Sequence, residues 1–213
     1  MTPNAGPGRL IYVIGASGAG KDSVISEARR RLGLNSGVAF AIRFITRHAD
    51  AGGEAHISLT RQEFADRRAA GSFALDWDSH DLSYGIGHEI DHLLLSGRHV
   101  VVNGSREYLP IAAQRYPTIL PVLIDVAPDV LRERLTMRGR ETPGEIDARL
   151  SRAVAQADVD HPALTRICNN GPLAETVEVF LAAIGISETA REAGDGSNRS
   201  FPRPGEPARR SPG

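Results

Sequence analysis

The residues best suited to chemistry lie in one short segment near the N-terminus, Gly15-Ala16-Ser17-Gly18-Ala19-Gly20-Lys21-Asp22-Ser23. Its glycines let the backbone bend until several N–H groups converge on one phosphate group. The positive end of the helix that follows adds attraction for an anion, and Lys21 can reach oxygens that gain negative charge during phosphoryl transfer. The G-x-x-x-x-G-K spacing therefore predicts that this segment binds the phosphates of a nucleotide.

Asp22 occupies the position at which such a loop usually has a serine or threonine that ligates magnesium. A carboxylate beside bound triphosphate is repelled unless a cation lies between them, and magnesium prefers oxygen ligands. The strand that often supplies a metal-holding aspartate ends here in Asn103. We expect Asp22 to support magnesium, directly or through water, while Ser23 binds a phosphate oxygen. The alternative is that Asp22 only caps the helix N-terminus.

Apolar runs and helical patterns alternate on both sides of this loop. A buried strand is predicted at 10–14, and the helix after the loop has apolar residues on one face at Val24, Ile25, Ala28 and Leu32. Further strands are predicted at 38–45, 73–77, 99–102, 119–126 and 164–168. Further helices are predicted at 61–70, 87–95, 107–115, 128–136, 144–157 and 173–184. This alternation predicts an α/β fold with a parallel sheet covered by helices on both faces.

Composition limits the class of protein. The chain has 213 residues, of which 41% are hydrophobic and 24% charged, so it suits one domain of ordinary size. A formal net charge of -1 gives no basic field for nucleic acid or anionic lipid. No export signal or membrane-spanning run is evident, so we expect a cytoplasmic protein that binds neither nucleic acid nor membrane. Residues 187–213 are rich in Pro, Gly, Ser and Arg and predict a disordered tail.

Several motifs together resemble the guanylate kinases, from about residue 9 to residue 184. The matching pieces are the phosphate-binding loop, Phe44-Ile45-Thr46-Arg47, Glu63-Phe64, Asp76-Trp77, Tyr84-Gly85, Arg138-Gly139 and Asn169-Asn170. Within that superfamily the sequence is similar to the ribose 1,5-bisphosphate phosphokinase family, through KDS after the loop glycines, YGIG at 84–87 and VNGSRE at 102–107. The resemblance implies a P-loop kinase domain over residues 9–186, after an N-terminal extension at 1–8.

The departures from guanylate kinases concern the residues that read guanine. Where those enzymes have Glu before the tryptophan, Ser or Thr after Tyr-Gly, and Asp at the strand end, this chain has Asp76, Ile86-Gly87 and Asn103. A buried base edge without its partners would cost about 1–3 kcal/mol per unpaired group. Cationic and hydroxyl positions that would hold the acceptor's phosphate are kept in part. By resemblance, the acceptor-binding residues are Arg43, Arg47, Asp76, Tyr84, Asn103 and Arg106.

The resemblance implies a reaction in which ATP phosphorylates the 1-phosphate of ribose 1,5-bisphosphate to give 5-phosphoribosyl 1-diphosphate and ADP, with Mg²⁺ as cofactor. The attacking phosphate oxygen is already anionic at neutral pH, so the site has to supply cations and alignment rather than a general base. Two alternatives remain open: a nucleoside monophosphate kinase with altered base preference, and a binding or scaffold protein on this fold without turnover. The sequence leaves the oligomeric state unassigned.

Arginines after the predicted strand at 119–126 bracket two glycine-containing turns, the layout of a mobile lid. We expect an acceptor-binding subdomain at about 40–86 and a lid at about 138–145. By resemblance, Arg138 and Arg149 act in the lid and join Lys21 and Asp22 as the catalytic residues. Arg132 and Arg134 are interpreted as a solvated helical face. Asn169 and Asn170 border the adenine of ATP or form an ordinary turn.

Two further features are assigned no catalytic role. His88-Glu89-Ile90-Asp91-His92 spells H-E-x-x-H, which on a helix could present two imidazoles to zinc, but the third ligand of the extended motif is out of register. We interpret it as a partly exposed polar helix face. Cys168 lies in a predicted strand and is interpreted as a small buried thiol.

Overall fold

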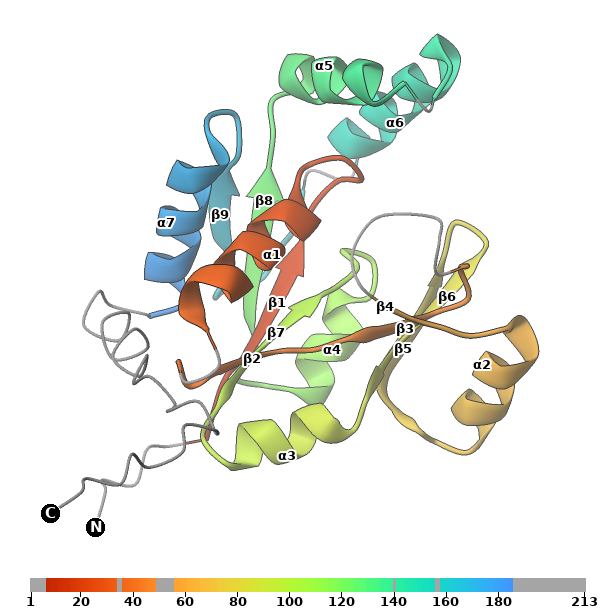
Figure 1. Cartoon of the computed structure of the whole chain (residues 1–213), viewed down its shortest axis with the longest axis vertical. Coiled ribbons are helices and arrows are strands. Elements are labelled where there is room, and N and C mark those ends of the chain that lie inside the picture. The colour runs from red at the N-terminus through yellow and green to blue at the C-terminus, as the bar shows by residue number, and fades with distance from the viewer. Residues whose placement is uncertain (1–6, 34–35, 49–55, 140, 156–157, 186–213) are drawn as a thin grey trace, which may run out of the picture.

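The computed structural model describes residues 7–33, 36–48, 56–139, 141–155 and 158–185 (Figure 1). Its main element is a five-stranded sheet in the order β2-β7-β1-β8-β9. The strands are β1 (Leu10–Ile14), β2 (Val38–Phe40), β7 (His99–Asn103), β8 (Leu120–Asp125) and β9 (Thr165–Cys168). All neighbouring strands in it run parallel. Residues 1–6, 140 and 187–213, and with them the predicted tail, lie outside the described residues.

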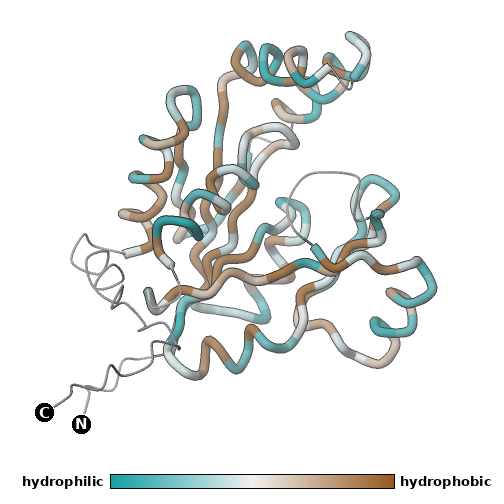
Figure 2. Tube along the Cα trace, viewed as in Figure 1, coloured by the Kyte–Doolittle hydropathy of each residue, from teal (hydrophilic) through white to brown (hydrophobic). Residues whose placement is uncertain are grey.

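Helices cover both faces of this sheet, as the sequence predicted. All five residues of β1 are buried, and they alternate between two cores. Ile11 and Val13 pack with α1 (Lys21–Leu32) and α7 (Leu173–Ala183) on one face. On the other face, Leu10, Tyr12 and Ile14 pack with α3 (Glu89–Leu95) and α4 (Leu109–Arg115). In Figure 2 the hydrophobic colour is concentrated along the central strands, which agrees with this two-sided burial.

A second, smaller sheet was not predicted. Its order is β4-β3-β6-β5, from β3 (Arg43–Ile45), β4 (His56–Ser58), β5 (Phe73–Ser79) and β6 (Leu82–Gly87). The prediction of one strand over 38–45 was wrong, because the chain leaves the five-stranded sheet after Phe40 and enters the small sheet at Arg43. The strands at 56–58 and 82–87 were missed. The first pairs with β3, which lies well before it in the sequence, whereas the second follows β5 in a hairpin and also pairs with β3. The helix α2 (Arg61–Ala69) packs on one face through Phe64.

Two helices project beyond the five-stranded sheet at the end where β8 stops (Figure 1). They are α5 (Pro128–Arg138) and α6 (Pro143–Ala155), which share a small core of Leu131, Leu135, Ile146 and Leu150. The turn between them falls within the segment predicted as a lid. Within the described residues, no helix combines the length and apolar character that a membrane span needs.

Side chains of the H-E-x-x-H segment make hydrogen bonds within the fold. The ring nitrogens of His88 lie 2.8 Å from Asp91 Oδ2 and 3.1 Å from the carbonyl oxygen of Gly71. The Tyr116 hydroxyl donates to Asp91 Oδ1 at 2.6 Å, and Arg115 donates to Asp91 Oδ2 at 3.3 Å. Among the described residues, no group of three or more His, Cys, Asp or Glu side chains could hold a metal. Asp91 therefore ties α3 to the end of α4.

The contacts around Asp91 stabilise its ionised carboxylate, so this charge contributes to the free energy of unfolding. Burial opposes ionisation, but hydrogen bonds from Tyr116 and His88 and the charge of Arg115 outweigh it and lower the pKa of Asp91. Burial and the bond to Asp91 raise the pKa of Tyr116 to about 12, so this donor stays protonated. A lowered carboxyl pKa stabilises the fold above the unfolded-state value of about 3.9, and the contribution is lost as pH falls through the folded-state value.

We predict that Asp91→Asn lowers the free energy of unfolding by about 1–2 kcal/mol at pH 7, because charge-assisted hydrogen bonds are lost. The difference from the parent protein should shrink as pH falls below about 4. Urea unfolding measured between pH 3 and pH 7 checks both points. Asp160→Asn, at an exposed aspartate, is the control and should change little. A constant difference over the whole pH range would contradict the assignment.

Candidate active site

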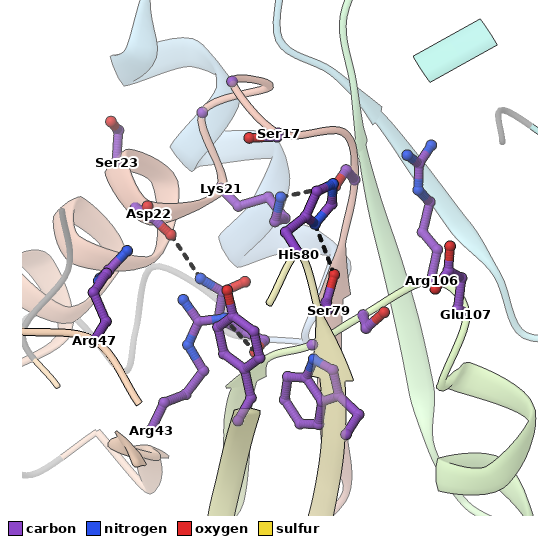
Figure 3. Close-up of a pocket in the computed structure, with 18 of the residues that line it drawn as sticks. Ser17, Lys21, Asp22, Ser23, Arg43, Arg47, Ser79, His80, Arg106 and Glu107 are labelled. Carbon is purple, nitrogen blue, oxygen red and sulfur yellow. Dashed lines mark hydrogen bonds between the residues drawn. The ribbon is translucent and has the colours of Figure 1, made fainter. Parts of the chain in front are cut away.

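The cavity that the phosphate-binding loop shares with the small sheet has a volume of about 330 Å³ and is called the main cavity below. It lies where the ends of β1 and β7 meet the small sheet (Figure 3). Ligands of open parallel sheets commonly bind at the carboxyl ends of the strands. The lining residues come from the loop after β1, the small sheet, the segment after β7 and α5: Gly15, Ser17, Gly18, Gly20, Lys21, Asp22, Ser23, Arg43, Arg47, Trp77, Ser79, His80, Tyr84, Asn103, Gly104, Ser105, Arg106, Glu107 and Arg138.

The loop between β1 and α1 has a backbone that requires glycine. Gly15, Gly18 and Gly20 have φ angles of 151°, 92° and 93°. A Cβ on Gly15 would lie 2.4 Å from the carbonyl oxygen of Ile124, and one on Gly20 would lie 2.4 Å from Asn169 Nδ2. The Lys21 ammonium folds back over the loop and donates to the carbonyl oxygens of Gly15 and Ala16 at 2.7 and 3.0 Å. The ammonium group is thus held over the concave side of the loop.

Asp22 lies in the first turn of α1 and points into the main cavity. The N-cap residue is Gly20 and no side chain makes a capping hydrogen bond there, so Asp22 does not cap the helix. Asn103 Nδ2 donates to Asp22 Oδ1 at 2.6 Å (Figure 3). Asn103 is only 5% exposed, whereas the Asp22 side chain is open to the cavity. A buried amide at the end of β7 therefore fixes an accessible carboxylate on the loop.

Aromatic rings and arginines form the wall opposite the loop. Trp77 stacks on Tyr84 with ring centroids 5.5 Å apart and an interplanar angle of 5°. The Arg43 guanidinium lies 5.2 Å from the centroid of the Tyr84 ring, and its Nη1 donates to the carbonyl oxygen of Asn103 at 3.4 Å. Arg47 lines the same wall, with Nη2 3.4 Å from His56 Nδ1. The fold thus brings together in one cavity four of the residues expected to bind the acceptor: Arg43, Arg47, Tyr84 and Asn103.

The structure does not bring Asp76 into this group. Neighbouring residues of a strand face opposite sides of a sheet, and Trp77 faces the cavity. Asp76 faces α2 instead, where its carboxylate accepts from Arg68 Nε at 2.6 Å. The alternation of apolar and polar residues over Leu75–Ser79 could have indicated this, because only one of two adjacent residues can face a ligand.

Arg106 lines two cavities, the main one and a second of about 340 Å³ next to α5 and α6. Burial lowers its pKa and the charges of Glu107 and Asp125 partly oppose this, but an arginine stays protonated at neutral pH. Figure 3 shows Arg106 and Glu107 on the side of the main cavity away from Arg43 and Arg47. Cys168 lines the second cavity and is exposed, so its interpretation as a buried thiol was wrong.

A third cavity, of about 390 Å³, adjoins the loop on the side of α7. It is lined by Gly18, Gly20, Ser23, Arg134, Met137, Arg138, Asn169, Gly171 and Leu173. Arg138 lines both this cavity and the main one. The interpretation of Arg134 as a solvated side chain was wrong, because it is half-buried beside Gly20. Its spacing of four residues from Arg138, which places both on one helix face, was the available signal.

Helix α6 contacts the loop directly. Arg149 Nη1 donates to Ser17 Oγ at 2.8 Å, and Arg149 Nη2 lies 3.2 Å from Glu141 Oε1. Arg132 pairs with Asp147 at 2.7 Å on an exposed face, as expected for a solvated residue. Arg140, within the segment expected to form the lid, lies outside the described residues.

The two asparagines after β9 have different positions. Asn169 is buried, and its Nδ2 donates to the carbonyl oxygen of Ala19 at 2.7 Å while its Oδ1 accepts from Thr176. It therefore supports the phosphate-binding loop from behind and also lines the third cavity. Asn170 Oδ1 accepts from the Ala127 N–H at 2.8 Å and lines the second cavity instead.

Six lining residues were not predicted as site residues: Trp77, Ser79, His80, Gly104, Ser105 and Glu107. The first three belong to the β5–β6 hairpin, with His80 at its tip, and the other three follow β7. The sequence signal was the pair of short alternating segments flanking His80-Asp81, which is typical of a hairpin. It gave no indication that the tip reaches the phosphate-binding loop, because that depends on how the two sheets are placed.

Several curated relatives carry the same description. The chain is 58% identical over 176 residues to "Ribose 1,5-bisphosphate phosphokinase PhnN" of Desulfomicrobium baculatum, covering 83% of this chain and 94% of that protein. Proteins of the same name from Burkholderia pseudomallei and Pseudomonas fluorescens are 52% and 48% identical, covering 83% and 86% of this chain and 95% and 98% of theirs. No protein-family model matches the chain.

Solved structures support the fold alone. A guanylate kinase from Anaplasma phagocytophilum has a TM-score of 0.61 at 14% identity, covering 87% of this chain and 90% of its own. An unliganded sugar kinase from a Janibacter species has a TM-score of 0.50 at 18% identity, covering 86% of this chain and 98% of its own. These structures agree with the predicted P-loop kinase fold.

We predict that Gly104→Ala lowers the free energy of unfolding by about 2–4 kcal/mol. An added Cβ would lie 2.1 Å from the ring of Tyr12, which is fully buried, so either the ring or the segment that carries Ser105 and Arg106 has to move. Chemical unfolding measures the effect. Gly144→Ala is the matched control, because its Cβ would meet nothing within 4 Å, and it should be neutral or slightly stabilising. Equal stability of the two variants would contradict this packing.

Proposed function

The chain belongs to the ribose 1,5-bisphosphate phosphokinase family, and from this premise we propose that it transfers the γ-phosphoryl group of ATP to the 1-phosphate of ribose 1,5-bisphosphate. The products would be 5-phosphoribosyl 1-diphosphate and ADP. As a member of this family the protein is a phosphotransferase. The observation that carries the specific reaction is a single cavity in which the loop that carries Lys21 faces the arginines of the small sheet.

Charge in the main cavity suits an acceptor with two phosphate groups. Lys21, Arg43, Arg47, Arg106 and Arg138 contribute cationic groups, against the carboxylates of Asp22 and Glu107. Arginine binds phosphate oxygens through paired N–H groups in a fixed geometry. We therefore assign acceptor binding to Arg43, Arg47, Tyr84, Asn103 and Arg106, and leave Asp76 out.

The aromatic residues argue for an acceptor without a base. Trp77 contacts both Tyr84 and Tyr108, with ring centroids 5.5 and 5.6 Å apart, and Arg43 covers Tyr84. These rings are engaged with one another rather than presented for stacking on a purine. Asp76, at the position where guanylate kinases have a guanine-binding Glu, faces α2 and Arg68. A sugar phosphate needs neither stacking nor recognition of a base edge.

Transfer at this site would need alignment and cations and no general base. An anionic oxygen of the 1-phosphate forms the new P–O bond while the bond from the γ-phosphorus to the bridging oxygen of ADP breaks. Lys21 would exchange its bonds to the Gly15 and Ala16 carbonyl oxygens for bonds to the phosphate in transfer. Arg138 and Arg149 would approach from α5 and α6 and stabilise the charge on the equatorial oxygens.

On the donor side, we assign the ATP phosphates to residues 15–23 and the adenine to the third cavity. Ser23 and Arg134 line this cavity together with Asn169, which suits a base that extends from the α-phosphate end of the loop. Asn170 lines the second cavity instead, and we assign it a structural role at the start of α5.

The residues present fit a magnesium ion beside the phosphates. The Asp22 carboxylate is open to the cavity and held at a fixed position by Asn103, and hard oxygen ligands are what magnesium requires. When bound, Mg²⁺ would neutralise charge on the β- and γ-phosphates. Asp22 would hold it directly or through water, and Asn103 would orient Asp22 through the 2.6 Å hydrogen bond.

We predict that Asp22→Asn raises the magnesium concentration needed for half-maximal activity about tenfold, because carboxylates that orient a metal or its waters affect affinity by factors of this size. Titration of Mn²⁺ followed by electron paramagnetic resonance, with ATP present, gives a second readout independent of turnover. Asp129→Asn, in the exposed first turn of α5 and outside the cavity, is the control. Unchanged metal dependence in Asp22→Asn would rule out metal support.

A coupled assay of ADP release tests the proposed reaction directly. We expect turnover with ribose 1,5-bisphosphate and little with GMP. In the same assay, Lys21→Ala should lower kcat at least about 100-fold, because it removes the ammonium group that would stabilise the transferring phosphoryl group. Turnover with GMP alone would identify a nucleoside monophosphate kinase. Turnover with neither acceptor would indicate a binding protein on a kinase fold.

A further inference from the structure

We propose that His80, at the tip of the β5–β6 hairpin, is a catalytic residue that donates a hydrogen bond to the phosphate oxygens at the junction between phosphoryl donor and acceptor. The inference rests on the proposed function and adds a residue to its site. His80 is carried by the small sheet, yet it lines the main cavity together with Lys21 of the phosphate-binding loop.

The hairpin holds His80 in a backbone conformation that side chains seldom adopt. Ser79 pairs with Leu82, and the two residues between them, His80 and Asp81, have φ angles of 49° and 61°. A two-residue turn with both residues left-handed normally uses glycine, asparagine or aspartate, so Asp81 is a common residue in such a turn and His80 is the less common one. Neither residue is glycine here, so the turn carries conformational strain that a Gly pair would avoid. Strain of this kind is often found at functional sites.

The imidazole is oriented toward the phosphate-binding loop. Its Nδ1 lies 2.8 Å from Ser79 Oγ. With Ser79 donating to Nδ1, the proton of a neutral ring is on Nε2. Figure 3 shows the edge of the ring remote from Ser79 turned toward Lys21. His80 can therefore present an N–H donor to an anion held between the loop and the small sheet.

The position of His80 complements the other cationic groups. Lys21 approaches from the loop, Arg43 and Arg47 from the small sheet near β3, and Arg138 from the lid. The hairpin tip places a donor from β5 and β6 in the same cavity as the loop, where the transferring phosphoryl group and the attacking phosphate would meet. Donors aimed at charge that develops during the reaction contribute to kcat more than to ground-state binding.

A pair of glycine variants separates the imidazole from the backbone. His80→Gly removes the ring and makes the left-handed turn easier to adopt, so stability should be kept or slightly raised. We expect its kcat with ribose 1,5-bisphosphate to fall about 10- to 100-fold with little change in the KM for ATP. Added imidazole should restore part of the rate. Asp81→Gly relieves the same kind of strain at an exposed residue outside the cavity and should keep parent kinetics.

The outcomes distinguish this inference from the proposed function. If the parent protein turns over ribose 1,5-bisphosphate and His80→Gly stays within about twofold of Asp81→Gly, the role of His80 is overturned, because loss of a donor should cost more. The role of His80 would also be overturned if His80→Gly were slow, were not accelerated by imidazole, and had a lower free energy of unfolding than the parent protein. A parent protein without turnover on this acceptor would instead overturn the proposed function.

Discussion

The need to hold two phosphate-bearing anions within bonding distance is the constraint on which the proposed site depends. Like charges a few ångströms apart in a partly dry cavity repel by kilocalories unless cations lie between them. The cations come from segments far apart in sequence: Lys21 after β1, Arg43 and Arg47 in and after β3, and Arg138 at the end of α5. They meet only because β1 and β7 are parallel neighbours and the chain turns from one sheet into the other after Phe40.

The core positions this site through a few buried contacts. Tyr12 is fully buried in β1, and its hydroxyl accepts from the Ser105 N–H at 3.1 Å. Burial raises the pKa of Tyr12, so the hydroxyl stays protonated. The Gly104 N–H donates to the carbonyl oxygen of Val13 at 2.8 Å, which fixes the start of the segment after β7. At the end of that strand, Asn103 holds Asp22 on the neighbouring loop. Packing of β1 against β7 therefore sets the spacing between the loop and the wall of aromatic rings and arginines opposite it.

Local patterns could be predicted from the sequence, and arrangements that depend on distant pairing could not. The loop after β1 follows from glycine spacing between a strand and a helix, which neighbouring residues determine. The division of 38–45 into β2 and β3 depends on pairing with β7 and β6, and no nearby residue marks it. Asp76 was misplaced because a family motif was carried over without strand alternation. His80 was missed because its relevance depends on where a hairpin tip lies relative to another sheet. The binding roles of these residues stay predictions.

Calorimetric titration of ribose 1,5-bisphosphate into the protein saturated with magnesium and a non-hydrolysable ATP analogue tests the central claim most directly. If the cavity holds both anions at once through its cations, binding will occur at about one acceptor per chain and will weaken as ionic strength rises. The absence of acceptor binding to the nucleotide-saturated protein, or tighter binding of GMP than of the bisphosphate under the same conditions, would contradict the account.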